Sequence, residues 1–204
     1  MANSTTSEDI LAGYKAYEEH DKRDSIYRVA TFLIKHYWGK PADMADALGV
    51  LLLVWNQAFY RYGSFDFDAL EKCIGDNLPV IVRFRDRDIL SLSASDEESI
   101  KTLFDKFLKA LKVTSKKHKV RRSPVAVAKT LHMLAPAFFP LWDEKIAKQY
   151  GCYYSYQPAD VYLDFCWKTK AIADEVRVLL LPEGKSTIKR IDEYNYSKYT
   201  QGWI

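Results

Sequence analysis

The sequence has few of the residues that build metal sites and disulfide frameworks. Its 204 residues include three cysteines, Cys73, Cys152 and Cys166, and no two of them have the spacing of a metal-ligand pair. An odd number of scattered cysteines argues against a disulfide scaffold and favours a reducing compartment. The four histidines show no metal-ligand spacing either. We therefore expect a cytoplasmic protein with no metal and no cofactor.

Long apolar runs and glycine-rich fingerprints are missing as well. The first ten residues, MANSTTSEDI, are polar and lack the apolar core of a signal peptide. The longest apolar run, Gly49 to Trp55, is far too short to cross a bilayer. No P-loop and no dinucleotide-binding glycine pattern is present. These absences predict no membrane partner and no nucleotide cofactor.

The composition is that of a soluble globular protein. Apolar residues make up 48% of the chain, charged residues 28% and aromatic residues 14%, and the net charge is +3. A mildly basic balance permits a polyanionic partner such as DNA without requiring one. We expect a single domain over residues 1–204, with 1–115 as its N-terminal part and 116–204 as the part that carries the motif described below.

Helical periodicity dominates the chain and predicts an all-α, compact multi-helix domain. The expected helices cover 6–20, 25–37, 41–62, 66–74, 95–111, 124–135, 143–151, 158–181 and a terminal segment after 186. One segment, 78–92, departs from this pattern. There Arg83, Arg85 and Arg87 alternate with other residues, which favours a short strand or an extended loop, with the arginines paired to nearby aspartates.

The stretch from Ser123 to Gly151 is the most informative part of the chain. Ser123 can cap a helix that has Pro124 at its first position and Lys129 early on its length. After an apolar turn, Asp143 stands at the start of the next helix. An aspartate there can simply be an N-cap, stabilised by the helix dipole by roughly 0.3–1 kcal/mol. The same place would also hold an ionised carboxylate at a cleft rim, as an electrostatic catalyst needs.

This stretch resembles the helix-hairpin-helix DNA glycosylases. That family carries a hairpin L-P-G-V-G-x-K-T-A, an apolar helix, and then V-D-T-H-V-x-R-V; this chain reads P-V-A-V-A-K-T from Pro124 and L-W-D-E-K-I from Leu141. By the resemblance, which covers about 30 residues, Lys129 corresponds to the Schiff-base lysine of the bifunctional members and Asp143 to the catalytic aspartate. It implies a glycosylase-like helical fold and an N-glycosylase or lyase that excises damaged bases in DNA repair.

The hairpin itself departs from the family pattern. Val125 and Val127 stand where the family has glycines. Those glycines let backbone amides approach a DNA phosphate, and a β-branched residue is a poor substitute at such a turn. The sequence therefore leaves two structures open, a hairpin at this place or one continuous helix from Pro124.

Aromatic and basic residues near the motif suggest how a nucleic acid would bind. Trp142, Tyr153 and Tyr154 are candidates for stacking on a flipped base, and their alternative role is core packing. A basic run directly before the motif could contact phosphates, or it could be a solvated loop. The run comprises Lys116, Lys117, Lys119, Arg121 and Arg122.

Two functions follow from these residues. The first is a DNA lesion enzyme that uses Lys129 and Asp143. The second is a non-catalytic helical module on the same scaffold that binds nucleic acid or protein. A protein partner or a homo-oligomer is compatible with either.

Overall fold

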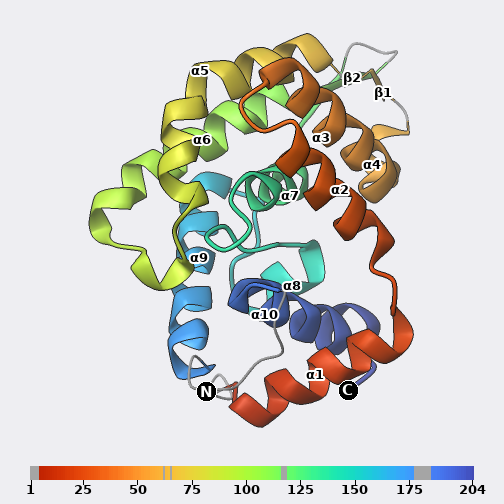
Figure 1. The fold of residues 1–204 in the computed structure, drawn as a ribbon, viewed down its shortest axis with the longest axis vertical. Helices are drawn as coiled ribbons and strands as arrows, with labels where there is room; N and C mark the ends of the chain where they lie inside the picture. The colour runs from red at the N-terminus through yellow and green to blue at the C-terminus, as the bar shows by residue number, and fades with distance from the viewer. Residues whose placement is uncertain (1–4, 62, 65, 116–118, 177–184) are drawn as a thin grey trace.

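The computed structural model describes residues 5–61, 63–64, 66–115, 119–176 and 185–204. Helices make up most of this structure, which confirms the expected compact, mostly α-helical fold (Figure 1). The α-helices are α1 (Ser7–His20), α2 (Ser25–His36), α3 (Pro41–Trp55), α4 (Gln57–Tyr60), α5 (Phe67–Arg85), α6 (Glu97–Ala110), α7 (Pro124–Leu134), α8 (Glu144–Gln149), α9 (Pro158–Val176) and α10 (Thr187–Asn195). Three shorter turns of helix are η1 (Ile89–Ser91), η2 (Ala94–Asp96) and the π-helix η3 (Tyr196–Gln201).

A small antiparallel sheet, which the sequence patterns did not predict, lies at one end of the molecule. Its strands are β1 (Gly63–Ser64), β2 (Val113–Ser115) and β3 (Val120–Arg121), with β2 in the middle. A side chain at Gly63 would lie 1.7 Å from Cγ1 of Val113, so only glycine fits at this crossing. These strands are too short to show the alternation by which a strand is recognised in sequence.

The two ends of the chain pack together. Helix α1 lies against α10, and Figure 1 shows the red and blue ends of the ribbon side by side. The contact is close because a side chain at Gly13 would come within 2.7 Å of Cα of Tyr194. The hydroxyl of Ser197 donates a hydrogen bond to the carbonyl of Gly13 at 2.9 Å. This packing places α10 beside the motif helices α7 and α8.

Helix α7 runs through the core. It contacts α2, α3 and α6, and most of its side chains are buried. The apolar turn that follows is buried as well, with Phe138 and Phe139 fully covered and packed on Phe84 of α5. The core therefore fixes both ends of the turn that separates Lys129 from Asp143.

Most of the segment 78–92 is helical, in α5 up to Arg85 and in η1 from Ile89 to Ser91, so the predicted strand or extended loop is wrong. Helix α5 continues through Gly75, where we expected a stop, and through Pro79 to Arg85. Its buried side chains, among them Ile74, Ile81 and Phe84, keep helical spacing, and their burial outweighs the two helix breakers. A proline ring inside a helix clashes with the carbonyl four residues earlier, which for Pro79 is the carbonyl of Gly75. Glycine has the most backbone freedom to adjust to this clash.

The arginines of this segment have different partners, because Arg85 is the last residue of α5 and Arg87 lies beyond the end of the helix. Arg85 donates to the carbonyl of Leu134 at 2.8 Å. Arg87 makes a bidentate pair with Asp96, at 2.7 and 2.8 Å. The predicted pairing is therefore found for Arg87, with a more distant aspartate than expected.

The helix expected over 41–62 is divided. Helix α3 ends at Trp55, and α4 is a separate short helix beginning at Gln57. Asn56 between them donates from Nδ2 to Oγ of Ser123 at 3.2 Å. This bond joins the end of α3 to the N-cap of α7, immediately beside the predicted motif.

Candidate functional site

Lys129 and Asp143 line the same pocket. Its volume is about 410 Å³, within the range of small-molecule sites. The wall is formed by the C-terminal end of α3, the second turn of α7, the first turn of α8, one face of α10 and the link from α1 to α2. Two residues fourteen positions apart in the sequence thus meet at one surface. The structure brings together the pair that the sequence singled out.

Helix α7 positions Lys129. The helix begins at Pro124 as one continuous segment, and Oγ of Ser123 accepts from the amide of Ala126 as its cap. The positions that correspond to the family's hairpin glycines are therefore helical, as the second of the two alternatives predicted. Lys129 lies in the second turn and reaches across to the end of α3.

The Lys129 amine has unusual surroundings. Its Nζ donates to the carbonyl of Trp55 at 2.9 Å and lies 4.7 Å from the centre of the Trp55 ring. Burial lowers the pKa of Lys129 to about 8, and the negative charges of Asp143 and Asp192 oppose part of this shift. With a pKa of about 8, roughly a tenth of this amine is neutral at pH 7, and the neutral amine is nucleophilic.

Asp143 is held by two hydrogen bonds. Its Oδ1 accepts from the amide of Ile146 at 2.7 Å, which makes it the N-cap of α8. Its Oδ2 accepts from the hydroxyl of Thr200 in η3 at 2.8 Å. The capping role expected from the sequence is confirmed. The carboxylate is also fixed at the pocket wall, so capping and a place in a site are compatible.

Sequence reasoning missed four further charged residues of this pocket: Asp21, the C-cap of α1, and three that form a cluster. Lys189 and Asp192 come from α10, and Asp24 comes from the N-cap of α2. Lys189 is 1% exposed, and its Nζ lies 3.3 Å from a carboxylate oxygen of each aspartate. The available signal was the spacing of Lys189 and Asp192 on α10, where each directly follows an isoleucine of the buried face, Ile188 or Ile191.

This cluster shifts the pKa values of its members. Burial raises the pKa of Asp192 to about 6, against the attraction of Lys189. Burial alone would lower the pKa of Lys189, but the surrounding carboxylates, with Asp192 first, raise it above its ordinary value. The pocket wall therefore holds one lysine that stays charged and one, Lys129, that loses its proton easily.

The fully buried His132 lies behind the pocket wall and contacts one of its residues, Tyr27. Its Nδ1 lies 2.7 Å from the carbonyl of Phe139, and a carbonyl can only accept, so Nδ1 donates. Burial lowers the pKa of His132 to about 3, so the ring is neutral and its Nε2 accepts from the hydroxyl of Tyr27 at 3.2 Å. Tyr27, which lines the pocket, is held in place by this bond.

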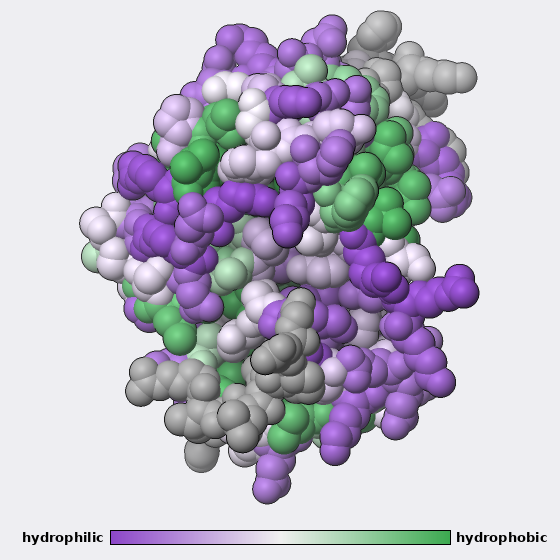
Figure 2. Space-filling model, viewed as in Figure 1, coloured by the Kyte–Doolittle hydropathy of each residue, from purple (hydrophilic) through white to green (hydrophobic). Residues whose placement is uncertain are grey.

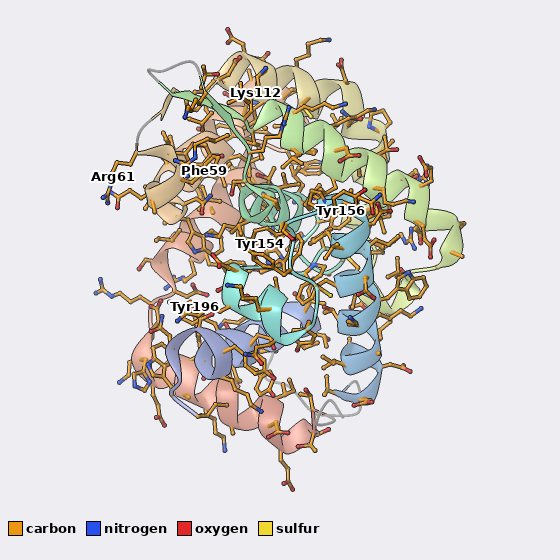
Figure 3. All side chains as sticks on the ribbon, turned by 180° about the vertical axis from the view of Figure 1, so that it is seen from behind. Phe59, Arg61, Lys112, Tyr154, Tyr156 and Tyr196 are labelled. Carbon is orange, nitrogen blue, oxygen red and sulfur yellow. The ribbon has the colours of Figure 1, made fainter. Side chains whose placement is uncertain are left out.

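The three predicted stacking residues have different surroundings. Trp142 is 1% exposed and packs on Phe165 with an interplanar angle of 18°, so protein covers its faces and none is free for a base. Tyr154 is partly buried, with its ring edge-on to Trp142 at 4.9 Å, and Figure 3 shows it beside α8. Tyr153 is 43% exposed and has Lys148 over its ring. Only Tyr153 presents a ring substantially to solvent.

The basic run is described in part. Lys116 and Lys117 lie outside the described residues. Lys119, Arg121 and Arg122 are exposed, and the Arg121 guanidinium lies 5.4 Å from the ring centre of Phe59. Figure 3 places Phe59 and Arg61 beside the small sheet. In the chain they follow α3, which ends at Trp55.

The described residues also bear on other types of site. In these ranges no group of three or more histidine, cysteine or acidic side chains is arranged to hold a metal ion. No helix in the same ranges combines the length and apolar character needed to span a bilayer. The three cysteines are free thiols, all of them buried. The chemistry available at the Lys129 pocket is therefore that of an amine, carboxylates and aromatic rings.

Comparison of the chain with protein-family models, with curated proteins and with solved structures finds no match in any of the three.

Proposed function

We propose that this protein is a DNA glycosylase-like enzyme that processes damaged bases through Lys129 and Asp143. One observation carries the proposal: a lysine with a pKa of about 8 and a rigidly held aspartate share the wall of one pocket. Sequence resemblance singled out the same two residues. The cytoplasm is the proposed place of action, because its reducing conditions suit three free thiols.

The reaction begins with the neutral amine of Lys129. Its lone pair attacks C1′ of the damaged nucleoside, so the Nζ–C1′ bond forms while the C1′–base bond breaks. The bonding electrons leave with the base, which takes up a proton. The C1′–O4′ bond then breaks, the ring oxygen takes up the proton that Nζ loses, and a protonated imine joins Lys129 to C1′. Water hydrolyses this imine and returns the free amine, or loss of the C2′ proton expels the 3′-phosphate and cleaves the strand.

Asp143 contributes charge at a fixed position. Positive charge develops on the sugar as the base departs, and a carboxylate already held in place stabilises it without reorganising. Both oxygens of Asp143 accept hydrogen bonds, from Ile146 and Thr200. The resulting orientation is what an electrostatic catalyst needs, and a proton is not required of this group.

Borohydride trapping tests the reaction directly. Wild-type protein is incubated with oligonucleotides that carry an abasic site or a damaged base, and borohydride reduces any imine to a stable adduct. We expect an adduct with the wild type and none with Lys129→Ala. Lys72→Ala is the matched control, because Lys72 is a surface lysine on α5, 76% exposed, whose removal leaves the pocket intact. An adduct that persists in Lys129→Ala would contradict the proposal.

A second candidate function is a non-catalytic module that binds nucleic acid or protein on the same scaffold. The observation that favours it is that both residues already have structural partners. Lys129 donates to a backbone carbonyl that ends α3, and Asp143 caps α8. If no oligonucleotide gives an adduct and no base is released, this second function replaces the first.

A further inference from the structure

A second and larger hollow adjoins the Lys129 pocket. Its volume is about 840 Å³, and it lies between the end of α1, the link to α2, the outer face of α2 and the start of α10. Figure 2 shows hydrophilic residues gathered over the side of the molecule where α1 leads into α2. Six of the residues that line the hollow are lysine or arginine, and three are acidic. The hollow is therefore positively charged.

Four of these cations are available to a ligand. Lys22, Arg23, Arg28 and Lys35 are exposed, and within the described part of the chain none has a carboxylate at ion-pair distance. Arg28 and Lys35 lie two turns apart on α2, about 10 Å along its axis. Charges in such a row suit a ligand that carries repeated negative charges, such as a phosphate backbone.

An exposed aromatic ring lies among these cations. Phe32, between Arg28 and Lys35 on α2, is 65% exposed and lines the hollow. Its ring stacks on that of His36, with centroids 5.9 Å apart and an interplanar angle of 13°. A phenylalanine in this position contributes little to the core. Its open ring is the type of surface on which an unpaired base stacks.

The hollow and the Lys129 pocket share part of their walls. Asp21, Asp24 and Tyr27 line both, so the two spaces meet at the link from α1 to α2. A chain bound along α2 would therefore pass the opening to Lys129. Its next residue could enter the smaller pocket while its backbone stays on the cations.

We propose that this hollow binds single-stranded nucleic acid, with Lys22, Arg23, Arg28 and Lys35 on its phosphates and Phe32 stacked on a base. The inference rests on the proposed function for its direction, which is delivery of one nucleotide to Lys129. A duplex fits less well, because its paired bases do not expose faces to Phe32. An acidic peptide would use the cations and leave Phe32 unused.

Fluorescence anisotropy with a labelled oligothymidylate of about 12 nucleotides measures this binding. For Arg28→Ala/Lys35→Ala we expect affinity at low salt to fall about tenfold or more. The slope of log affinity against log salt should fall by about 1.4, because each phosphate contact on a single strand contributes about 0.7. For Phe32→Ala we expect an affinity loss of about tenfold with no change in the salt slope, because stacking is not ionic.

Matched controls separate the hollow from general surface charge. Arg83→Ala/Lys109→Ala removes two exposed cations that line neither space, and should bind as the wild type does. Thermal unfolding of every variant checks that the fold is retained. Polyglutamate added as competitor should displace the oligonucleotide poorly. Equal competition by polyglutamate, or equal losses in the two double variants, would overturn the inference.

The two proposals fail in different ways. If the hollow variants lose binding while wild-type protein forms no borohydride adduct, the hollow is supported and the lyase reaction is not. If an adduct forms and the hollow variants bind as the wild type does, the reaction is supported and the hollow is not. No binding by the wild type at low salt would overturn the hollow.

Discussion

Lys129 and Lys189 line the same pocket and are both largely removed from water, yet their pKa values move in opposite directions. Burial lowers the pKa of Lys129 to about 8. The pKa of Lys189 is raised, because the carboxylates around it outweigh an equally unfavourable burial. The difference teaches that burial alone does not decide whether a lysine is charged. The charge of its hydrogen-bonding neighbours decides it.

The two amines differ in the charge of the groups around them. Lys189 has Asp24 and Asp192 at 3.3 Å and Glu193 at 3.7 Å, two of them on its own helix. Lys129 has a neutral partner, the Trp55 carbonyl, at 2.9 Å. We infer that the α10 cluster serves mainly to fasten α10 to α1 and α2. Lys129 is left as the amine that can change its protonation state.

The largest expected effect is the loss of a carboxylate from the α10 cluster. Glu193 is fully buried and pairs with Lys185, while Lys189 and Arg190 lie 3.7 and 3.8 Å away. In Glu193→Ala these buried cations lose a counter-charge, and we expect the free energy of unfolding to fall by about 3–5 kcal/mol. Urea unfolding followed by circular dichroism measures it.

The control for this change is an exposed pair. Asp76→Ala removes the ion-pair partner of Lys72. The side chain of Asp76 is 58% exposed and that of Lys72 is 76% exposed. We expect the free energy of unfolding to change there by no more than about 1 kcal/mol. Similar losses in Glu193→Ala and Asp76→Ala would show that the α10 cluster does not fasten the fold.

The next largest expected effect is on the pH dependence of stability, to which Lys129 and Lys189 contribute in different pH ranges. An unfolded lysine has a pKa near 10.5, so between about pH 8 and 10.5 the unfolded chain keeps the Lys129 proton that the folded protein has released. Because the unfolded state then binds more protons, stability rises with pH across this window, by roughly 2–3 kcal/mol. Lys189, whose pKa is raised, loses its contribution only above about 10.5.

Lys129→Met isolates this contribution. The difference in unfolding free energy between wild type and Lys129→Met, measured in urea at pH 7.5 and at pH 10, should change by the amount given above. Lys72→Met is the control for the loss of an exposed lysine. If the wild type and Lys129→Met keep a constant difference across the window, the pKa of Lys129 is not depressed.

Lys129 could be predicted as a site residue from the sequence, and Lys189 could not. Lys129 was found because Pro124, Ser123 and Asp143 mark helix starts through local rules of capping and proline geometry. Lys189 depends on Asp24, 165 positions earlier in the sequence. Nothing local indicates that α1 and α10 pack together, because the close contact at Gly13 involves only the absence of a side chain.

In the fold, too, features set by the local sequence were predicted and features set by distant contacts were not. Helix periodicity identified the main helices. It did not identify the path of α5, because Gly75 and Pro79 are local breakers and the burial of Ile81 and Phe84 depends on distant residues. The same limit applies to the pocket. Capping rules located Asp143, but only tertiary packing covers Trp142 and excludes it as a stacking surface.

The change with the least expected effect on the fold, Asp143→Asn, tests what Asp143 does for Lys129. An asparagine can still accept from the Ile146 amide through Oδ1, and its Nδ2 can donate to the Thr200 hydroxyl, so the cap survives. We expect the free energy of unfolding to fall by about 1 kcal/mol or less. The pKa of Lys129 should fall further, because the Asp143 charge opposes the effect of burial.

Two roles of Asp143 then predict opposite results in borohydride trapping. If Asp143 acted only on the Lys129 pKa, the variant would hold more neutral amine at pH 7 and form the adduct faster. Under the proposed function it forms the adduct about a hundredfold more slowly, because charge developing on the sugar loses its fixed counter-charge. The matched control is Asp192→Asn, which also removes a charge that raises the Lys129 pKa, without touching the helix cap. A slower reaction in Asp143→Asn alone assigns the charge-stabilising role to Asp143. An equal slowing in both variants would show that the pocket acts through its total charge, and that the contrast between its two lysines depends on the whole cluster.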